Sequence, residues 1–429
     1  MTAKLRALWL APIQLPVVDG GLSNRGGGWI EGWRWALEAH SPGVELAILG
    51  YGPFVHEPFA VGNATFFSFK PEPSNKYREL LRRWSHHYPV GDSGHESFNE
   101  ALTTFRPDII HVHGSESGLA KLSAASDVPT VLSLQGIATI WQRFMFSGQT
   151  CLDVVRDSAS VHFLKGSGYL HSYMTMRDRA ATERRILDDC RYVLGNTEWD
   201  KRVATVLCPS AIYYHGDRAV RREFYDHQWQ QSPGGDPVIY CTSGSAPYKG
   251  LEILLHAVAL LRGAGFPTLR VRIAGAAVGG GNWPALRRVI RQLRVDDAVS
   301  LLGVIDASAM VSELTAATVF VLPSHIENES NALIEAMLVG TPCVAAAVGG
   351  VPSIMRDRVD GLLYQDRDPF ALAGAIHRLI ADSDFATSLA ATGRATAHRR
   401  HDPANVANQL VSAYEDVIAR AGRSRAWDP

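Results

Sequence analysis

Two glutamates separated by seven residues stand out in the stretch SHIENESNALIEAM, residues 324–337. Glu327 falls in a predicted loop, and Glu335 falls in the first turn of the helix predicted behind it. A carboxylate accepts hydrogen bonds from hydroxyl groups, so Glu335 could bind a vicinal diol such as a ribose, and Glu327 could bind a second polyol. The alternative is that Glu335 caps its helix and Glu327 is solvated, which is the commoner outcome for an isolated pair of this kind.

The residues around the pair predict the loop and the helix. The apolar run TVFVLP, which Pro323 closes, is typical of a buried strand. Asn331 is a good N-cap for a helix through ALIEAMLV, and Gly340 is a good helix end. Backbone amides at such a helix N-terminus suit an anionic or hydroxyl-rich ligand.

A lysine and a pair of glycines accompany the two acids. Lys249, in SGSAPYKGLEILL, stands at the end of a predicted strand and just before a helix. A lysine there can neutralise a phosphate. The alternative is a surface lysine, but a helix start is a poor place for a cation, and Gly250 follows directly. The segment VGGVP, residues 348–352, offers a glycine pair where backbone can approach a ligand closely.

Short apolar runs alternate with amphipathic stretches along the whole chain. DIIHVHG, PVIYCTSG and TVFVLPS are typical of buried parallel strands, and residues 251–264 and 369–382 have helical periodicity. This alternation predicts βαβ units. The fold class expected is therefore α/β, with two Rossmann-like doubly wound parallel-sheet domains facing an interdomain cleft.

The strand pattern restarts near residues 228–240, where SPGGDP is a good linker. We therefore expect an N-terminal domain on the acceptor side over 1–232 and a C-terminal domain on the donor side over 233–402. The amphipathic segment 403–429 is expected to form a helix that packs back across the N-terminal domain. Ligands of doubly wound sheets bind at the carboxyl ends of the strands, so these ends should carry the site.

Composition excludes several classes of function. The chain has 429 residues, of which 46% are hydrophobic and 20% charged, with a formal net charge of −1. A chain with so little net charge is a poor candidate for nucleic-acid binding by bulk electrostatics. Five cysteines without CxxC spacing favour reduced thiols. The N-terminal stretch reads as a first strand, and no segment is apolar over a bilayer's thickness, so a cytoplasmic protein is expected.

The motifs together resemble a known family. PSHIENESNALIEAMLVGTPCVAAAVGGVPSI, followed by DGLLY, resembles the donor-binding signature of glycosyltransferase family 4, which are retaining enzymes of the GT-B fold. YKGLEILL and LLGVID fall in the expected order before it. RGGGW, DIIHVHG, VLSLQG and YVLGNTEWDKR extend the resemblance through the first half. AIYYHGDRAVRREFY is similar to bacterial transferases that assemble surface polysaccharides.

The resemblance implies a role for each motif. Glu335 would bind the nucleotide ribose, and Lys249 would neutralise the diphosphate leaving group. Glu327 would orient the donor sugar through its hydroxyls, without acting as a covalent nucleophile. The other residues implied in donor binding are Asn328, Glu329, Ser330 and Asn331 at the sugar, Val304 beside the base, and Gly26, Gly27 and Gly28 at the diphosphate.

Two positions depart from the family pattern. Gly244 stands where the family usually has an arginine, and Gln135 stands where many members have a histidine near the sugar. Loss of a cation at the diphosphate would cost roughly 1–3 kcal/mol of leaving-group stabilisation. Arg25, beside the glycine loop, is a candidate replacement. His113 is a third catalytic candidate, with a structural role as the equal alternative, and His111 is assigned a structural role.

No metal or organic cofactor is expected. The DRD sequence at 366–368 spells an Asp-x-Asp, but it lies away from the proposed donor residues and precedes a helix, where it serves as capping material. The partners expected are a nucleoside-diphosphate sugar, with UDP the preferred nucleotide, and a sugar or lipid-linked sugar acceptor. Residues 76–88 interleave bases with aromatics, so weak peripheral contact with the inner face of the cytoplasmic membrane is a further possibility, with a solvated helix face as the alternative.

Three rival functions stay open at this point. A GT-B epimerase or phosphorylase would use the same fold, although a phosphorylase needs a pyridoxal-binding lysine that the sequence does not offer. A nicotinamide-dependent dehydrogenase is disfavoured because no predicted strand leads into G-x-G-x-x-G with an acid at the right distance. A non-catalytic sugar-nucleotide sensor would account for Gly244 and Gln135.

Overall fold

The computed structural model describes residues 4–14, 28–52, 57–69, 92–116, 118–158, 163, 168–230, 234–276, 278 and 282–425. The chain divides into two compact units. Unit 1 comprises residues 1–142, 174–219 and 401–429, and unit 2 comprises residues 143–173 and 220–400.

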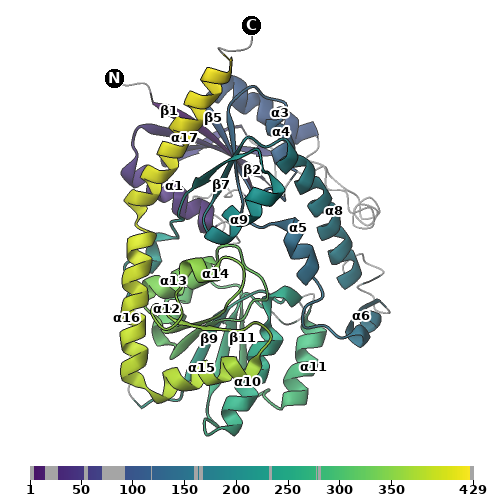
Figure 1. Ribbon diagram of the computed structural model, residues 1–429, viewed down its shortest axis with the longest axis vertical. Coiled ribbons are helices and arrows are strands. Elements are labelled where there is room, and N and C mark those ends of the chain that lie inside the picture. The colour runs from purple at the N-terminus through teal and green to yellow at the C-terminus, as the bar shows by residue number, and fades with distance from the viewer. Residues whose placement is uncertain are drawn as a thin grey trace. The chain divides into compact units, whose positions relative to one another are not determined.

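Unit 1 is built on a sheet whose described strands run in the order β3-β4-β2-β1-β5-β6-β7-β8; β1, β2, β5 and β7 are labelled in Figure 1. The pairings are parallel, except that β3 pairs antiparallel with β4. The strands are β1 (Leu5–Gln14), β2 (Val44–Tyr51), β3 (Phe59–Val61), β4 (Ala64–Phe69), β5 (Ile109–His113), β6 (Thr130–Ser133), β7 (Tyr192–Gly195) and β8 (Ile212–His215).

Helices cover both faces of this sheet because successive strand residues point to opposite sides. Ala7 and Trp9 of β1 join one buried core, and Leu8 and Leu10 join the other. The helical segments of the unit are α1 (Gly28–His40), α3 (Asp92–Glu100), a π-helical turn (Ala101–Phe105), α4 (Ala120–Ser123), α5 (Ala138–Trp141), α8 (Tyr169–Asp188, in this unit from Met174), α9 (Glu198–Leu207) and α17 (Pro403–Arg425).

The C-terminal helix α17 belongs to unit 1, although it follows the whole of unit 2 in the sequence. Leu410 and Tyr414 are buried in the same core as Trp9, and the Trp9 indole donates to the Tyr414 hydroxyl at 2.9 Å. The amphipathic pattern of the tail therefore reflects one face packed on α1 and the sheet.

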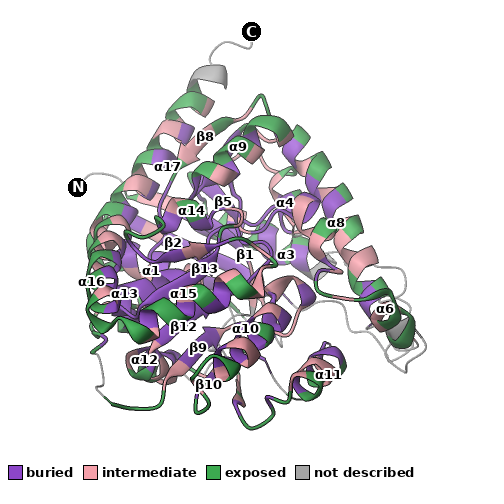
Figure 2. Ribbon diagram, turned by 60° about the horizontal axis from the view of Figure 1, so that its bottom comes forward, coloured by how far each residue is buried: buried purple, intermediate pink, exposed green. Residues whose placement is uncertain are grey.

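Unit 2 carries a parallel sheet with the strand order β11-β10-β9-β12-β13-β14. The strands are β9 (Val238–Thr242), β10 (Arg270–Ala274), β11 (Val299–Gly303), β12 (Val319–Leu322), β13 (Cys343–Ala346) and β14 (Leu362–Tyr364). β12 and β13 are buried along their whole length (Figure 2), as expected for central parallel strands.

Two cores lie on the two faces of this sheet. Val319 and Val321 pack with α10, α11 and α15, and Phe320 and Leu322 pack with α12 and α13. The helices are α6 (Cys151–Ser158), α10 (Leu251–Gly263), α11 (Trp283–Leu293), α12 (Ala307–Ala316), α13 (Asn331–Val339), α14 (Val351–Ile354), α15 (Pro369–Ala381) and α16 (Ser383–Arg400), with 3-10 turns at Gln142–Phe144, Arg222–Phe224 and Pro247–Lys249. Two doubly wound parallel-sheet units confirm the predicted fold class.

The two units differ from the expected division in two places. The chain passes into unit 2 after Ala219, before the SPGGDP segment, because Phe224 and Trp229 are buried in a unit 2 core. The Trp229 indole also donates to the carbonyl oxygen of Ala317 at 2.7 Å. In addition, residues 143–173 pack with unit 2 although they lie within the first half of the sequence. A loop-forming composition indicates a turn, whereas contacts with a hydrophobic core determine which unit a segment belongs to.

Candidate functional site

The loop that follows β12 leads into α13, and its cap differs from the prediction. Ser330, not Asn331, is the N-cap: its hydroxyl accepts from the Leu333 amide, and Asn331 is the first helical residue. Gly340 ends the helix with a φ of 82°, as its position predicts. Glu335 therefore lies in the second turn, and the prediction of the first turn was wrong. From there its side chain cannot cap the helix, so the simplest structural explanation of this glutamate no longer applies.

Glu335 is a buried carboxylate in an ion pair. It is 3% exposed, and its Oε1 accepts from Nη2 of Arg221 at 3.0 Å. Burial raises the pKa of Glu335, and Arg221 opposes that shift. A carboxylate offers about four acceptor positions, so one ion pair leaves capacity for hydroxyl donors.

Lys249 and Glu327 form a second ion pair across two loops. Lys249 ends the 3-10 turn after β9, and its Nζ lies 2.6 Å from Oε1 of Glu327, which is buried in the loop after β12. Burial lowers the pKa of Lys249, but the charge and hydrogen bond of Glu327 outweigh it, so the net shift is upward. Lys249 is therefore a fixed cation near neutral pH and cannot serve as a general base there.

Two glycines allow the loop around Glu327 to sit this close to its neighbours. A Cβ at Gly250, whose φ is 67°, would lie 2.0 Å from the Pro323 carbonyl oxygen. A Cβ at Gly349 would lie 1.9 Å from the Glu327 carbonyl oxygen, which accepts from the Gly350 amide at 3.1 Å. The glycine pair of the VGGVP segment therefore packs against the loop that carries Glu327.

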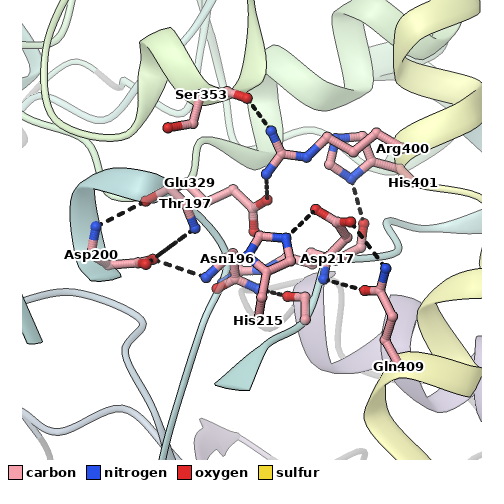
Figure 3. Close-up of polar contacts among 12 residues, drawn as sticks. Asn196, Thr197, Asp200, His215, Asp217, Glu329, Ser353, Arg400, His401 and Gln409 are labelled. Carbon is pink, nitrogen blue, oxygen red and sulfur yellow. Dashed lines mark hydrogen bonds and ion pairs between the residues drawn. The ribbon is translucent and has the colours of Figure 1, made fainter. Parts of the chain in front are cut away.

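The remaining loop side chains are mostly buried. Asn328, Glu329 and Ser330 are each less than a tenth exposed, and Asn331 is partly buried. Arg400, at the end of α16, lies 3.8 Å from Oε1 of Glu329 and donates to the Ser353 carbonyl oxygen (Figure 3). The Glu329 carboxylate thus faces the Arg400 guanidinium.

Val304 and Gly244 follow strands of the same sheet at their carboxyl ends. Val304 comes directly after β11 and is 70% exposed. Gly244 follows β9, and a Cβ there would meet no atom within 4 Å. Lys249 and Glu327 follow β9 and β12, so this sheet edge gathers a cation, acids and an exposed apolar side chain.

A profile of the family described as "Glycosyl transferases group 1" matches residues 224–396. Residues 224–396, the group 1 segment, are therefore similar to the group 1 glycosyltransferases. The group 1 segment contains Lys249, Glu327 and Glu335, whereas Arg221 lies three residues before it.

A curated relative shares the group 1 segment in part. The D-inositol 3-phosphate glycosyltransferase of Thermobifida fusca (strain YX) is 34% identical over 176 residues, which are 40% of this chain and 40% of that protein. The chain thus spans less than half the length of this relative.

Solved structures extend the likeness to nearly the whole chain. Sucrose-phosphate synthase from Thermosynechococcus elongatus has a TM-score of 0.75 at 18% identity, covering 97% of this chain and 100% of that one. Anabaena Alr3699/HepE in complex with UDP-glucose has a TM-score of 0.66 at 17% identity, covering 96% and 100%. The chain therefore has the GT-B fold.

The remaining predicted residues lie in unit 1 or outside the described residues. His113 ends β5 and is fully buried, and its ring nitrogens have no hydrogen-bond partner among the described residues. Burial, His111 and Arg218 lower the pKa of His113, so its ring is neutral at pH 7. Gln135 follows β6 and accepts from Nη2 of Arg218 at 2.8 Å. Gly28 is the first residue of α1.

Gly26, Gly27 and Arg25 lie outside the described residues, so the expected glycine loop is not described. The basic segment 76–88 lies outside them too. His111 is held between the Tyr414 hydroxyl at 2.6 Å and the Ser133 hydroxyl at 2.5 Å, which is a structural arrangement.

Asp368 caps α15 by accepting from the amides of Phe370 and Ala371, as its place before a helix predicts. Within the described ranges, no group of three or more His, Cys, Asp or Glu side chains could hold a metal ion. No described helix combines the length and the hydropathy needed to cross a bilayer.

Sequence reasoning missed Arg221, the partner of Glu335. The segment DRAVRR, near the middle of the chain, offers three arginines as candidates: Arg218, Arg221 and Arg222. Arg221 lies over the Phe224 ring at 5.0 Å, whereas Arg218 lies over the Trp33 ring at 5.8 Å in unit 1. A buried acid in a predicted helix signals that a cation must face it, but only the fold selects which one.

Proposed function

We propose that this chain transfers a sugar from a nucleoside-diphosphate donor to a hydroxyl acceptor, with retention of configuration at the anomeric carbon. The observation that carries the proposal is the pair of ion pairs, Lys249–Glu327 and Arg221–Glu335, at one sheet edge of the group 1 segment. A cation for phosphate and a buried acid for a diol are what a nucleotide sugar requires. Donor complexes of the structural neighbour with UDP-glucose support a UDP-sugar.

Each residue has a distinct task in this proposal. Glu335 accepts hydrogen bonds from the ribose hydroxyls while Arg221 holds its carboxylate in place. Val304 packs beside the base. The amides of residues 328–331 and the Glu327 carboxylate hold the hydroxyls of the sugar, and Lys249 contacts the diphosphate.

The bond from the anomeric carbon to the phosphate oxygen breaks as the bond to the acceptor oxygen forms on the same face of the sugar. Negative charge grows on the departing phosphate, and Lys249 is the cation that stabilises it. The acceptor's proton moves to the departing phosphate oxygen. Fixing donor and acceptor in one geometry lowers the entropic part of the barrier. Glu327 is engaged with Lys249, which suits orientation of the sugar better than covalent attack.

The acceptor in this proposal is a sugar or lipid-linked sugar in polysaccharide or glycolipid assembly at the inner face of the cytoplasmic membrane. Its basis is the resemblance of the middle of the chain to transferases that assemble surface polysaccharides. The relative named D-inositol 3-phosphate glycosyltransferase supports a polyhydroxylated acceptor.

Release of UDP from UDP-sugars tests the proposal. We expect UDP to be released only when a sugar acceptor is present. We also expect EDTA to leave the rate of this release unchanged. Lys249 supplies the positive charge that a divalent ion supplies in other transferases. A new sugar nucleotide formed without acceptor would indicate an epimerase instead. Tight UDP-sugar binding without turnover on any acceptor would indicate a sensor, and strict dependence on a divalent ion would contradict the metal-free mechanism.

Replacing Gly244 with arginine is expected to tighten UDP binding. The position follows β9 near Lys249, its φ is not in the left-handed region, and a side chain there has open space. A second charged donor to the diphosphate would contribute about 1–3 kcal/mol, which is about 5- to 150-fold in Kd. Isothermal titration with UDP measures the gain.

Gly374→Arg is the matched control, because Gly374 is exposed on α15 and a Cβ there also meets nothing within 4 Å. An equal gain in UDP affinity from both variants would show that the effect comes only from the change in net charge. An unchanged Kd in Gly244→Arg would argue against a diphosphate at this edge of the sheet.

A further inference from the structure

His325 is a buried histidine held between two carboxylates. Its side chain is 1% exposed, its Nδ1 lies 2.6 Å from Oδ1 of Asp366, and its Nε2 lies 2.7 Å from Oε1 of Glu252. An ionised carboxylate only accepts hydrogen bonds, and an imidazole donates from both nitrogens only when it is protonated. The arrangement therefore fits an imidazolium that donates one hydrogen bond to each acid.

The three residues connect the segments that carry the Lys249–Glu327 pair. Glu252 lies in the first turn of α10, three residues after Lys249, and His325 lies two residues before Glu327. The His325 amide also donates to the carbonyl oxygen of Tyr248 at 2.9 Å, one residue before Lys249. Asp366 adds a third anchor from the loop after β14. A shift of the His325 ring would thus move the loop of Glu327 relative to the loop of Lys249.

We propose that His325, clamped by Glu252 and Asp366, is the positioning residue that sets the geometry of the Lys249–Glu327 pair. The proposal rests on the proposed function of that pair in donor binding. His325 does not touch the donor in this assignment; it acts through the two residues that do.

We call His325, Glu252 and Asp366 together the clamp. Other charged and titratable groups face it. Arg367 lies 3.5 Å from Oδ2 of Asp366, and the Tyr364 hydroxyl of β14 is buried near both acids, which raise its pKa further than burial alone. Lys249 and Glu327 lie on the adjoining loops. The segment before α6 packs on Glu252 as well, since a Cβ at Gly148 would lie 2.0 Å from its Oε1. Glu252 is thus covered by the segment before α6, whereas Asp366 is partly exposed and has Arg367 as a second cation.

The clamp has a defined pH range. Burial lowers the pKa of His325, but Asp366 and Glu252 outweigh it and raise the pKa to about 9. An unfolded histidine titrates near 6.5. The contribution of the clamp to stability is therefore complete below about pH 6.5 and is lost as the pH rises through about 9.

Hydrogen exchange of the ligand-free protein tests the clamp without reference to function. We expect His325→Gln to speed amide exchange in both segments 324–330 and 247–250, while exchange elsewhere in unit 2 changes little. His256→Gln is the matched control, because His256 is exposed on the same helix as Glu252. Unchanged exchange in the two segments of a folded His325→Gln protein would overturn the proposal.

Titration with UDP tests the consequence for the site. We expect His325→Gln to bind UDP at least tenfold more weakly at pH 7.5, and wild-type affinity to fall between pH 7.5 and 9.5 in a way that His325→Gln does not reproduce. A merely structural histidine would lower the melting temperature without this pH-dependent loss of affinity. Equal UDP affinity in the variant and the wild type would overturn the positioning role.

Asp366→Asn provides a second variant if His325→Gln does not fold, because it keeps the ring and removes one acid. It should weaken UDP binding in the same direction and move the pH midpoint downward; an unmoved midpoint would overturn the clamp. If wild-type protein bound no UDP while His325→Gln still accelerated exchange in both segments, the proposed function would fail and the clamp would stand.

Discussion

Replacement of Glu335 by alanine is expected to abolish the thermal stabilisation that we expect UDP to give the wild-type protein. Two hydrogen bonds from a ribose diol to a buried carboxylate contribute about 3 kcal/mol or more together, which is a hundredfold or greater change in Kd. A ligand raises the melting temperature in proportion to the logarithm of its concentration over Kd, so the shift should vanish at concentrations that saturate the wild type. Differential scanning fluorimetry with UDP measures it.

The alanine variant also leaves the partly buried Arg221 without its carboxylate partner, so the ligand-free protein itself loses stability. Glu335→Gln keeps the shape and separates the two effects, because an amide oxygen accepts more weakly than a carboxylate. Glu313→Gln is the matched control: Glu313 pairs with Arg272 at 2.6 Å in the same unit and has no role in the proposed donor binding. A full UDP shift in Glu335→Gln would contradict the ribose assignment.

The pH dependence of UDP binding should also depend on Glu335. Since burial raises the pKa of Glu335, its protonation begins at a higher pH than that of an ordinary glutamate. The neutral carboxyl accepts hydrogen bonds less strongly and releases Arg221. UDP affinity should therefore fall on acidification earlier in the wild type than in Glu335→Gln.

Replacement of Lys249 by methionine is expected to lower turnover by about 10²–10³, the usual effect of removing one group that stabilises charge in a transition state. The methionine keeps most of the apolar stem and removes only the ammonium group. In the proposed reaction that group faces the phosphate on which negative charge grows. Steady-state rates at saturating UDP-sugar measure the loss, which should appear in kcat more than in KM.

A neutral double variant separates catalysis from folding. Lys249→Met alone leaves Glu327 buried and unpaired with its lysine, so it is expected to be less stable. Lys249→Met with Glu327→Gln removes both charges and should recover much of the stability but none of the turnover. Lys201→Met, at an exposed position of α9, should behave as the wild type. Recovery of turnover in the double variant would refute the role given to the ammonium group.

The segments that carry the site were predictable because their signals are local. A run such as TVFVLP followed by a loop, an N-cap residue and a helix ended by Gly340 lies within about twenty residues, and β12, α13 and the glycine cap are where it predicts. Lys249, which precedes Gly250 at the start of α10, was predictable from a local signal as well. Even the misplaced cap was an error of one residue, the usual uncertainty of a helix boundary.

The unit to which each segment belongs was not predictable from local signals. SPGGDP has the composition of a linker, yet Phe224 and Trp229 before it are already buried in the core of unit 2. Residues 143–173 join that unit although strands of unit 1 precede and follow them. Turn composition reports where the chain bends, and only burial reports which core it joins.

By itself, the sequence determined two doubly wound sheets and the acids and lysine that follow their strands, because periodicity and turn chemistry act between neighbours in the chain. Only the tertiary structure decided the partners: Arg221 for Glu335, 114 residues away, Glu327 for Lys249, 78 residues away, and Asp366 and Glu252 for His325. The physical reason is that a buried charge must find an opposite charge, but the strand order of the sheet determines which candidates come within hydrogen-bond distance.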